Sequence, residues 1–222
     1  MNDLQKMGGV AALIMAATFV VAFVVFLGIL TPAGYFDADV EAAQKAAILV
    51  DNQASVSISY LTSFVVFGIF LVVLALALYE RLQAGASTIA QTATAFGLIW
   101  AGLVLASGMV AKIGIGTVVA LYGNDPAQAG SVWLAIESVQ LGLGGGNEIV
   151  GGLWVLLVSW ATLRAGGLPK ALNYFGVVIS VAALLTVIPA LEVLVPVFGL
   201  GLIAWFIWLG IVMLRSSQST AA

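Results

Sequence analysis

Residues 144–148 read Gly144-Gly145-Gly146-Asn147-Glu148 and lie in the middle of an apolar run from Ser131 to Leu163. A carboxylate at the centre of an apolar helix is costly to place in lipid, so it is a candidate functional residue. Three consecutive glycines let a neighbouring backbone or a ligand approach the helix closely. The stretch predicts that its surroundings form a membrane-spanning helix with a polar site near the middle.

The composition of the whole chain supports a membrane protein. Of its 222 residues, 63% are hydrophobic and 8% are charged, whereas about a quarter of the residues of a soluble domain are charged. The chain has no cysteine and no histidine, which removes the common ligands of zinc, haem, copper and iron–sulfur clusters. We therefore expect no metal and no cofactor. The net charge of −3 without a basic block argues against a nucleic-acid partner.

Six apolar segments are long enough to cross a bilayer, and in lipid such segments must be helices. They form one predicted integral membrane domain, residues 1–222, with helices at about 8–30, 55–82, 87–122, 131–164, 170–188 and 195–214. The polar segment 37–53 carries apolar residues at helical spacing and predicts a short helix outside the hydrocarbon. The predicted fold is all-α, a six-transmembrane-helix bundle with a short extracytoplasmic helix between helices 1 and 2.

The basic residues predict the orientation of the chain. With a cytoplasmic N-terminus, only Lys45 falls in an outer loop, and five basic residues are inside: Lys6, Arg81, Arg164, Lys170 and Arg215. This asymmetry follows the positive-inside rule. We expect a multi-pass protein of the bacterial cytoplasmic (inner) membrane with both termini cytoplasmic. The first apolar run is interpreted as a retained helix, and cleavage after Ala33 is the alternative.

Helices three and four carry most of the intramembrane polar residues. An antiparallel hairpin about Pro126 places Lys112 level with Gln140 and about 4.5 Å along the axis from Glu137. We therefore expect an ion pair between Lys112 and Glu137, with Gln140 beside it. Glu148 lies about 12 Å deeper than Gln140 by the same helical rise. The candidate ligand-binding residues are Glu148, Asn147, Gln140, Glu137 and Lys112.

Each of these residues also has an ordinary structural interpretation. A lysine–glutamate pair between adjacent helices can be a packing clamp, and a neutral Glu148 can be a hydrogen bond between helices. The functional alternatives for Glu148 are a proton site or a ligand anchor. The aromatic group of Trp205, Phe206 and Trp208 is expected to be a packing or lipid surface. A Ser107–Lys112 catalytic dyad has poor geometry, because the two side chains point about 140° apart around one helix.

Part of the C-terminal half resembles a known family. The matching residues run from Glu148 through Gly152-Leu153-Trp154 and Arg164-Ala165-Gly166-Gly167-Leu168-Pro169-Lys170 to Gly176. They are similar to the DUF4386 family of uncharacterised bacterial membrane proteins. The chain lacks the proline that family members often carry after the tryptophan, where it reads Val155-Leu156-Leu157-Val158-Ser159. The resemblance implies a similar six-span layout and no assigned activity.

Three functions remain open at this point. The first is a non-catalytic accessory or scaffolding subunit of a membrane complex, with other membrane protein subunits as partners. The second is a small transporter, or a protein that binds a lipid or a small apolar ligand at an intramembrane site of Glu148 and Asn147, where the glycines would break the helix. The third, an intramembrane enzyme, ranks last, so we expect that the protein is not an enzyme.

Overall fold

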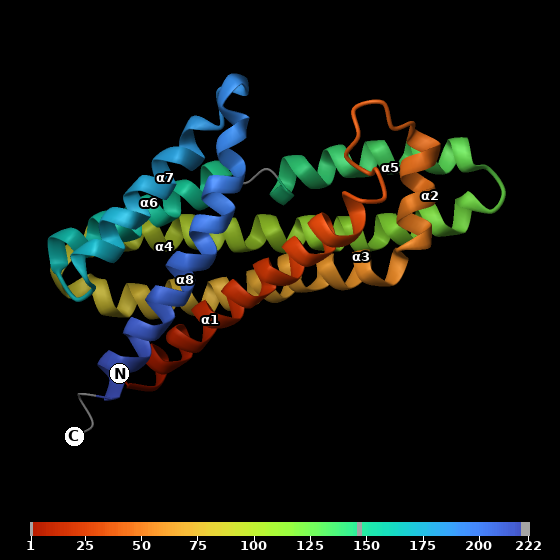
Figure 1. Cartoon of the computed structure of the whole chain (residues 1–222). Coiled ribbons are helices and arrows are strands. Elements are labelled where there is room, and N and C mark those ends of the chain that lie inside the picture. The colour runs from red at the N-terminus through yellow and green to blue at the C-terminus, as the bar shows by residue number, and fades with distance from the viewer. Residues whose placement is uncertain (1, 146–147, 219–222) are drawn as a thin grey trace. The chain divides into compact units, whose positions relative to one another are not determined.

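The computed structural model describes residues 2–145 and 148–218, and in this part of the chain every regular element is helical (Figure 1). The all-α prediction is confirmed. In chain order the elements are α1 (Asn2–Val25), the π-helix η1 (Phe26–Leu30), α2 (Ala42–Asp51), α3 (Gln53–Tyr60), the π-helix η2 (Leu61–Val66), α4 (Phe67–Tyr122), α5 (Pro126–Gln140), the π-helix η3 (Leu141–Gly145), α6 (Glu148–Ala165), α7 (Lys170–Leu185), the 3-10 helix η4 (Pro189–Leu194) and α8 (Val195–Gln218).

Within the described residues, four helical stretches are long and apolar enough to cross a membrane: Asp3–Leu30, Gln53–Tyr122, Pro126–Ala165 and Pro189–Ser216. A fifth apolar helix, Lys170–Leu185, is shorter. The short helix expected between the first two long ones is α2. These helices are those of a membrane protein, as the composition predicts.

The long helix α4 folds back on itself at Ala86. This residue alone leaves the helical region inside α4, with φ −150° and ψ 49°. A Cβ built on Gly97 would lie 3.1 Å from Cβ of Ala75, and one on Gly108 would lie 2.7 Å from Cβ of Phe64. In each pair, the two residues are equally far from Ala86 along the chain. The part of α4 after Ala86 therefore runs antiparallel to the part before it and to η2, and Gly97 and Gly108 make the close approaches possible.

A second antiparallel hairpin joins α4 to α5. Asp125 caps α5 because its side chain accepts a hydrogen bond of 2.9 Å from the backbone nitrogen of Gln128. Pro126 occupies the first turn, where proline is tolerated. Gly114 of α4 lies against Ile136 of α5, and these two residues are equidistant from Asp125. The register of this hairpin agrees with the predicted turn about Pro126 to within a residue or two.

The helices form two compact units. The first contains the described residues of 1–17, 68–102 and 147–222, so it holds α6, α7, α8, the start of α1 and the reversal of α4. Its core is aromatic: the ring centroid of Trp154 lies 5.6 Å from that of Trp100 and 5.9 Å from that of Trp205, and Phe206 packs on both Trp154 and Trp205. The expected packing role of Trp205 and Phe206 is thus confirmed, whereas Trp208 is exposed.

The second unit contains residues 18–67 and 103–146, of which the structure describes 18–67 and 103–145. Its helix pair α2 and α5 packs closely because Gly130 of α5 lies directly on the backbone of Ala42 and Ala43 in the first turn of α2. The loop between η1 and α2 turns at Gly34, whose φ of 79° suits glycine. That turn places Tyr35 in the core.

Candidate functional site

Glu137 of α5 lies at the centre of a polar network in the second unit. The Tyr35 hydroxyl donates a hydrogen bond of 2.6 Å to Oε1 of Glu137. Nζ of Lys45, on α2, lies 3.4 Å from Oε2 of the same carboxylate. Trp133 donates from its indole nitrogen to the Tyr35 hydroxyl at 2.5 Å. We call these four residues, Tyr35, Lys45, Trp133 and Glu137, the Glu137 network.

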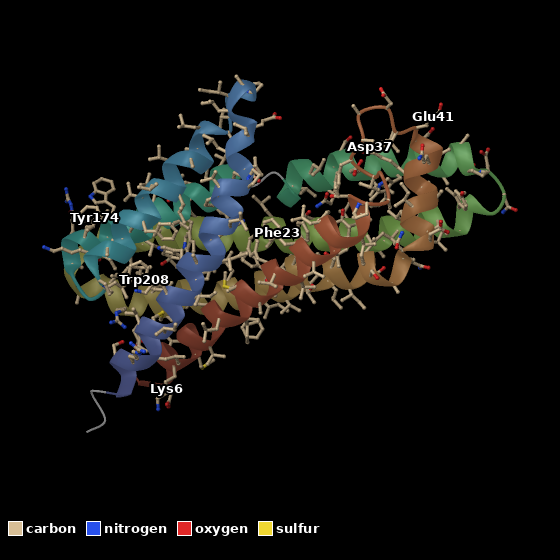
Figure 2. All side chains as sticks on the ribbon, viewed as in Figure 1. Lys6, Phe23, Asp37, Glu41, Tyr174 and Trp208 are labelled. Carbon is tan, nitrogen blue, oxygen red and sulfur yellow. The ribbon has the colours of Figure 1, made fainter. Side chains whose placement is uncertain are left out.

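The Glu137 network ties three segments together. Tyr35 belongs to the loop that carries Asp37 and Glu41 (Figure 2), Lys45 belongs to α2, and the other two residues are one turn apart on α5. Lys45 also lies 4.9 Å from the ring centroid of Tyr35, within the range of a cation–π contact. The charged groups are therefore paired inside the unit, and the network fastens the loop and α2 to α5.

The predicted ion pair between Lys112 and Glu137 is wrong. Glu137 pairs with Lys45, and the side chain of Lys112 is exposed. The reason is the direction of the lysine on α4. Ser107 and Gly114 are two helical turns apart and both face α5. Lys112 is five residues beyond Ser107, so its side chain points about 140° away from that face.

Gln140 is bound to α4 by two hydrogen bonds. Its side-chain nitrogen donates to Oγ of Ser107 at 3.0 Å, and the same Oγ donates to the backbone carbonyl of Gln140 at 2.9 Å. Both side chains are buried. A Cβ on Gly144 would lie 2.6 Å from Cβ of Ser107, so this glycine lets the two helices approach closely. Gln140 was predicted beside Glu137 as a ligand residue, and the structure uses it to join α5 to α4.

The remaining candidates lie in or near the glycine stretch. Gly144 and Gly145 belong to η3, while Gly146 and Asn147 fall outside the described residues. Glu148 is the first residue of α6 and is half-buried. A carboxylate in the first turn interacts favourably with the positive end of the helix dipole. The structure brings Glu137 and Gln140 together on α5, whereas Glu148 belongs to the other unit.

Arg81, which the sequence marked only as one of five basic residues on the cytoplasmic side, joins several helix ends in the first unit. Its Nη2 and Nε donate to the backbone carbonyl of Gly167 at 2.6 and 3.2 Å. Its Nη1 donates to Oε1 of Gln5 at 3.2 Å and to Oγ of Ser216 at 3.0 Å. Gly166 and Gly167 have φ of 77° and 92°, which only glycine adopts readily. The Gly-Gly turn therefore presents its carbonyl to the guanidinium.

The residues quoted for the family resemblance meet in the same unit. Trp154 packs between Trp100 and Trp205, and the absence of a side chain at Gly97 makes room for its indole nitrogen. Gly152 contacts Ala183, and Gly176 lies against Ser159 and the indole of Trp205. These residues are packing positions between helices. The family model described as a domain of unknown function, DUF4386, matches residues 7–214.

The chain belongs to the DUF4386 family. The match extends over nearly the whole chain, far beyond the segment 148–176 that carries the resemblance. Comparison with curated proteins and with solved structures gave no match. In this DUF4386 protein the motif residues Gly152, Trp154, Gly167 and Gly176 act through helix packing and through the Arg81 contacts.

The hydrogen bonds of Tyr35 lead to a prediction about stability and pH. Burial, reinforced by the hydrogen bond to Glu137, raises the pKa of Tyr35 well above its ordinary value of about 10. The folded protein therefore holds this proton more tightly than the unfolded chain does. The resulting stability is fully present below about pH 10 and is lost as the pH rises further. We expect thermal unfolding temperatures of the wild type to fall above pH 10, and to fall less steeply in Tyr35→Phe.

At neutral pH, Tyr35→Phe should cost about 2 kcal/mol, because it removes a donor to a charged group and leaves Oε1 of Glu137 without that bond. Tyr174→Phe is the matched control, since Tyr174 is 60% exposed and lies on α7. Its effect should stay within about 0.5 kcal/mol. Equal losses in the two variants would show that the Glu137 network does not fasten the loop.

A double-mutant cycle of Ser107→Ala and Gln140→Leu tests the hydrogen bonds that join Gln140 of α5 to Ser107 of α4. We expect a coupling free energy of about 0.6–1.7 kcal/mol, from the average to the largest value found for hydrogen bonds between helices by double-mutant cycles in a membrane protein. Equilibrium unfolding of the wild type, the two single variants and the double variant provides the measurement. Additive losses would contradict the contact. Thr117→Val on α4 is a suitable reference, because Thr117 is exposed and bonds only within its own helix.

Proposed function

We propose that this DUF4386 protein is an integral membrane protein of six crossings, forming one domain, with both termini in the cytoplasm of a bacterial cell. The length of α4 supports this count, because its 56 residues would span about 84 Å as a straight helix. The hydrocarbon is about 30 Å thick, so a reversal at Ala86 fits two crossings. The apolar α7, antiparallel to α6, supplies the fifth.

The distribution of charge supports the orientation. Five of the seven basic residues lie near helix ends that would share one side of the membrane, and the acidic loop between η1 and α2 would lie on the other side. Cysteine labelling tests this, because the wild type has no cysteine. Single cysteines at Glu41 and Asn124 should react with an impermeant maleimide in intact cells. A cysteine at Gln83, which is exposed near the reversal of α4, should react only after the membrane is opened.

For the biochemical role, we propose a non-catalytic accessory or scaffolding subunit of a membrane complex. One observation carries this proposal: polar groups of Glu137 and Gln140 are bonded to other segments of the same unit. Such bonds fix the positions of helices and make these residues structural. Helices whose positions are fixed in this way suit a subunit that supports others.

Recovery of a partner tests the proposed role. A photo-reactive residue at Val178 on α7, which is 64% exposed, should cross-link one stoichiometric membrane protein in native membranes. Ile113 on α4, which is 73% exposed, serves as the second position and separates a partner from random collisions. If neither position gave a protein adduct and the chain purified alone from native lipid, these results would argue against a subunit role.

A further inference from the structure

Arg81 gathers the segments that carry most of the basic residues of the chain. Its hydrogen bonds reach Gln5, Gly167 and Ser216. Gln5 is adjacent to Lys6, Ser216 is adjacent to Arg215, and Gly167 lies in the turn between Arg164 and Lys170. In Figure 1 the red start of α1, the yellow reversal of α4, the cyan turn after α6 and the blue end of α8 lie at one end of the first unit. We call the residues Lys6, Arg81, Arg164, Lys170 and Arg215 the basic face.

The basic face is strongly positive in a chain that is negative overall. Two acids, Asp3 and Glu80, are close in sequence to its five basic residues, so the seven residues together have a formal charge of +3, whereas the chain has −3. Every basic side chain in it except Arg81 is exposed. The other acids of this unit lie away from it, because Glu148 begins α6 and Glu192 lies between α7 and α8. Positive charge is therefore concentrated at one end of these helices.

Exposed aromatic side chains lie within one or two helical turns of the basic face. Trp160 is 46% exposed, and its ring centroid lies 5.2 Å from the guanidinium carbon of Arg164. Tyr174 follows Lys170 by one turn on α7, and Trp208 precedes Arg215 by two turns on α8. Figure 2 shows Lys6, Tyr174 and Trp208 with their side chains. Tyrosine and tryptophan beside basic residues are typical of the headgroup level of a membrane.

From this arrangement we infer that the basic face binds the phosphate headgroups of anionic phospholipids. Lysine and arginine near an anionic lipid surface each favour binding roughly fivefold. Phosphate oxygens accept the hydrogen bonds that exposed guanidinium and ammonium groups donate. The aromatic side chains place the basic groups at the depth where lipid phosphates lie. A zwitterionic headgroup has no net negative charge, so the basic face prefers anionic phospholipids to zwitterionic ones.

Competition between lipids tests the inference on the full chain. The protein, delipidated in mild detergent, is titrated with phosphatidylglycerol and with phosphatidylcholine of the same acyl chains, and bound lipid is counted by native mass spectrometry. We expect at least a fivefold preference for phosphatidylglycerol that falls as salt is added. A wild type without this preference, or with one insensitive to salt, overturns the inference. So does displacement of phosphatidylglycerol by inorganic phosphate, which would indicate a site for the free ion.

Two matched variants identify the residues. The neutral variant carries Lys6→Gln, Arg164→Gln, Lys170→Gln and Arg215→Gln and should lose the preference. The charge-preserving variant carries Lys6→Arg, Arg164→Lys, Lys170→Arg and Arg215→Lys and should keep it. Preference retained by the neutral variant contradicts the inference, and the salt titration of the wild type decides the case if that variant does not fold. The proposed subunit role is tested separately by partner recovery, so either idea can fail alone.

Discussion

Replacement of Trp154 by alanine is expected to lower the free energy of unfolding by about 3–5 kcal/mol. The indole of Trp154 is buried and touches Trp100, Trp205 and Phe206, whose ring centroids lie 5.6, 5.9 and 6.4 Å away. Alanine would leave a cavity lined by three aromatic rings that the surrounding helices cannot fill without moving. Equilibrium unfolding from mild detergent into sodium dodecyl sulfate, followed by circular dichroism, measures the loss.

The same helix provides the control. Trp160 of α6 is 46% exposed and contacts the guanidinium of Arg164. Trp160→Ala removes an identical side chain but creates no internal cavity, so it should cost no more than about 1 kcal/mol. If the two alanine variants lost the same stability, the aromatic core of the first unit would not be a major source of its stability.

Addition of a single methyl group at Gly130 is expected to destabilise the second unit by about 2–3 kcal/mol. A Cβ at this position would overlap the carbonyl carbon of Ala42, and it would lie 2.5 Å from the Ala42 oxygen and 2.6 Å from the Ala43 nitrogen. These are backbone atoms in the first turn of α2, so no side-chain rotation relieves the clash. Gly130→Ala must therefore push α2 away from α5, and the unfolding assay should show a lowered midpoint.

Gly116→Ala should have the opposite effect. Gly116 lies in α4, and a Cβ there would meet nothing within 4 Å. Alanine in a helix interior is more favourable than glycine by about 0.5–1 kcal/mol, so this variant should be equally or more stable than the wild type. If Gly130→Ala lowers the free energy of unfolding and Gly116→Ala does not, the strain lies at the contact between α2 and α5. If both variants change the free energy of unfolding in the same direction, helix propensity or lipid exposure dominates at both positions.

The helices and their order follow from the apolar composition and from the residues that end and begin helices. Apolar segments of this length must satisfy their own hydrogen bonds in lipid, so an all-α chain is the expected result. Pro126 and Asp125 end one helix and begin the next, which is why the predicted level of α4 against α5 agrees with the contact between Gly114 and Ile136. The separation of two residues along a helix axis is fixed by the rise per residue, so it can be calculated from their sequence numbers.

The partners of the polar residues were harder to predict. The hairpin argument places Lys112 at about the right level, but it ignores the direction of the side chain around α4, and the lysine is exposed. Glu137 bonds instead to Tyr35 and to Lys45, both of which lie far from it along the chain. Their positions depend on how the loop after η1 returns over the helices. Local periodicity contains no information about such a return.

The separation from Glu137 is 102 residues for Tyr35 and 92 residues for Lys45. Contacts this distant in sequence depend on the whole path of the chain between them, whereas the Gln140–Ser107 contact crosses a single hairpin turn. The hairpin contact was within reach of prediction for that reason, because a residue before the turn lies level with one after it. Arg81 was missed on the same grounds, since its three partners come from α1, from the turn after α6 and from α8.

The π-helices η2 and η3 have a consequence for how the length of this chain can change. A π turn accommodates one residue more than an ordinary helical turn, and it commonly arises as a single-residue bulge in an α-helix. Deletion of one residue from Leu61–Val66 or from Leu141–Gly145 can therefore restore regular α-helix locally. Elsewhere in a helix the same deletion rotates all later side chains by about 100°. We therefore expect a single-residue deletion to do less damage in these two segments than in the middle of α4.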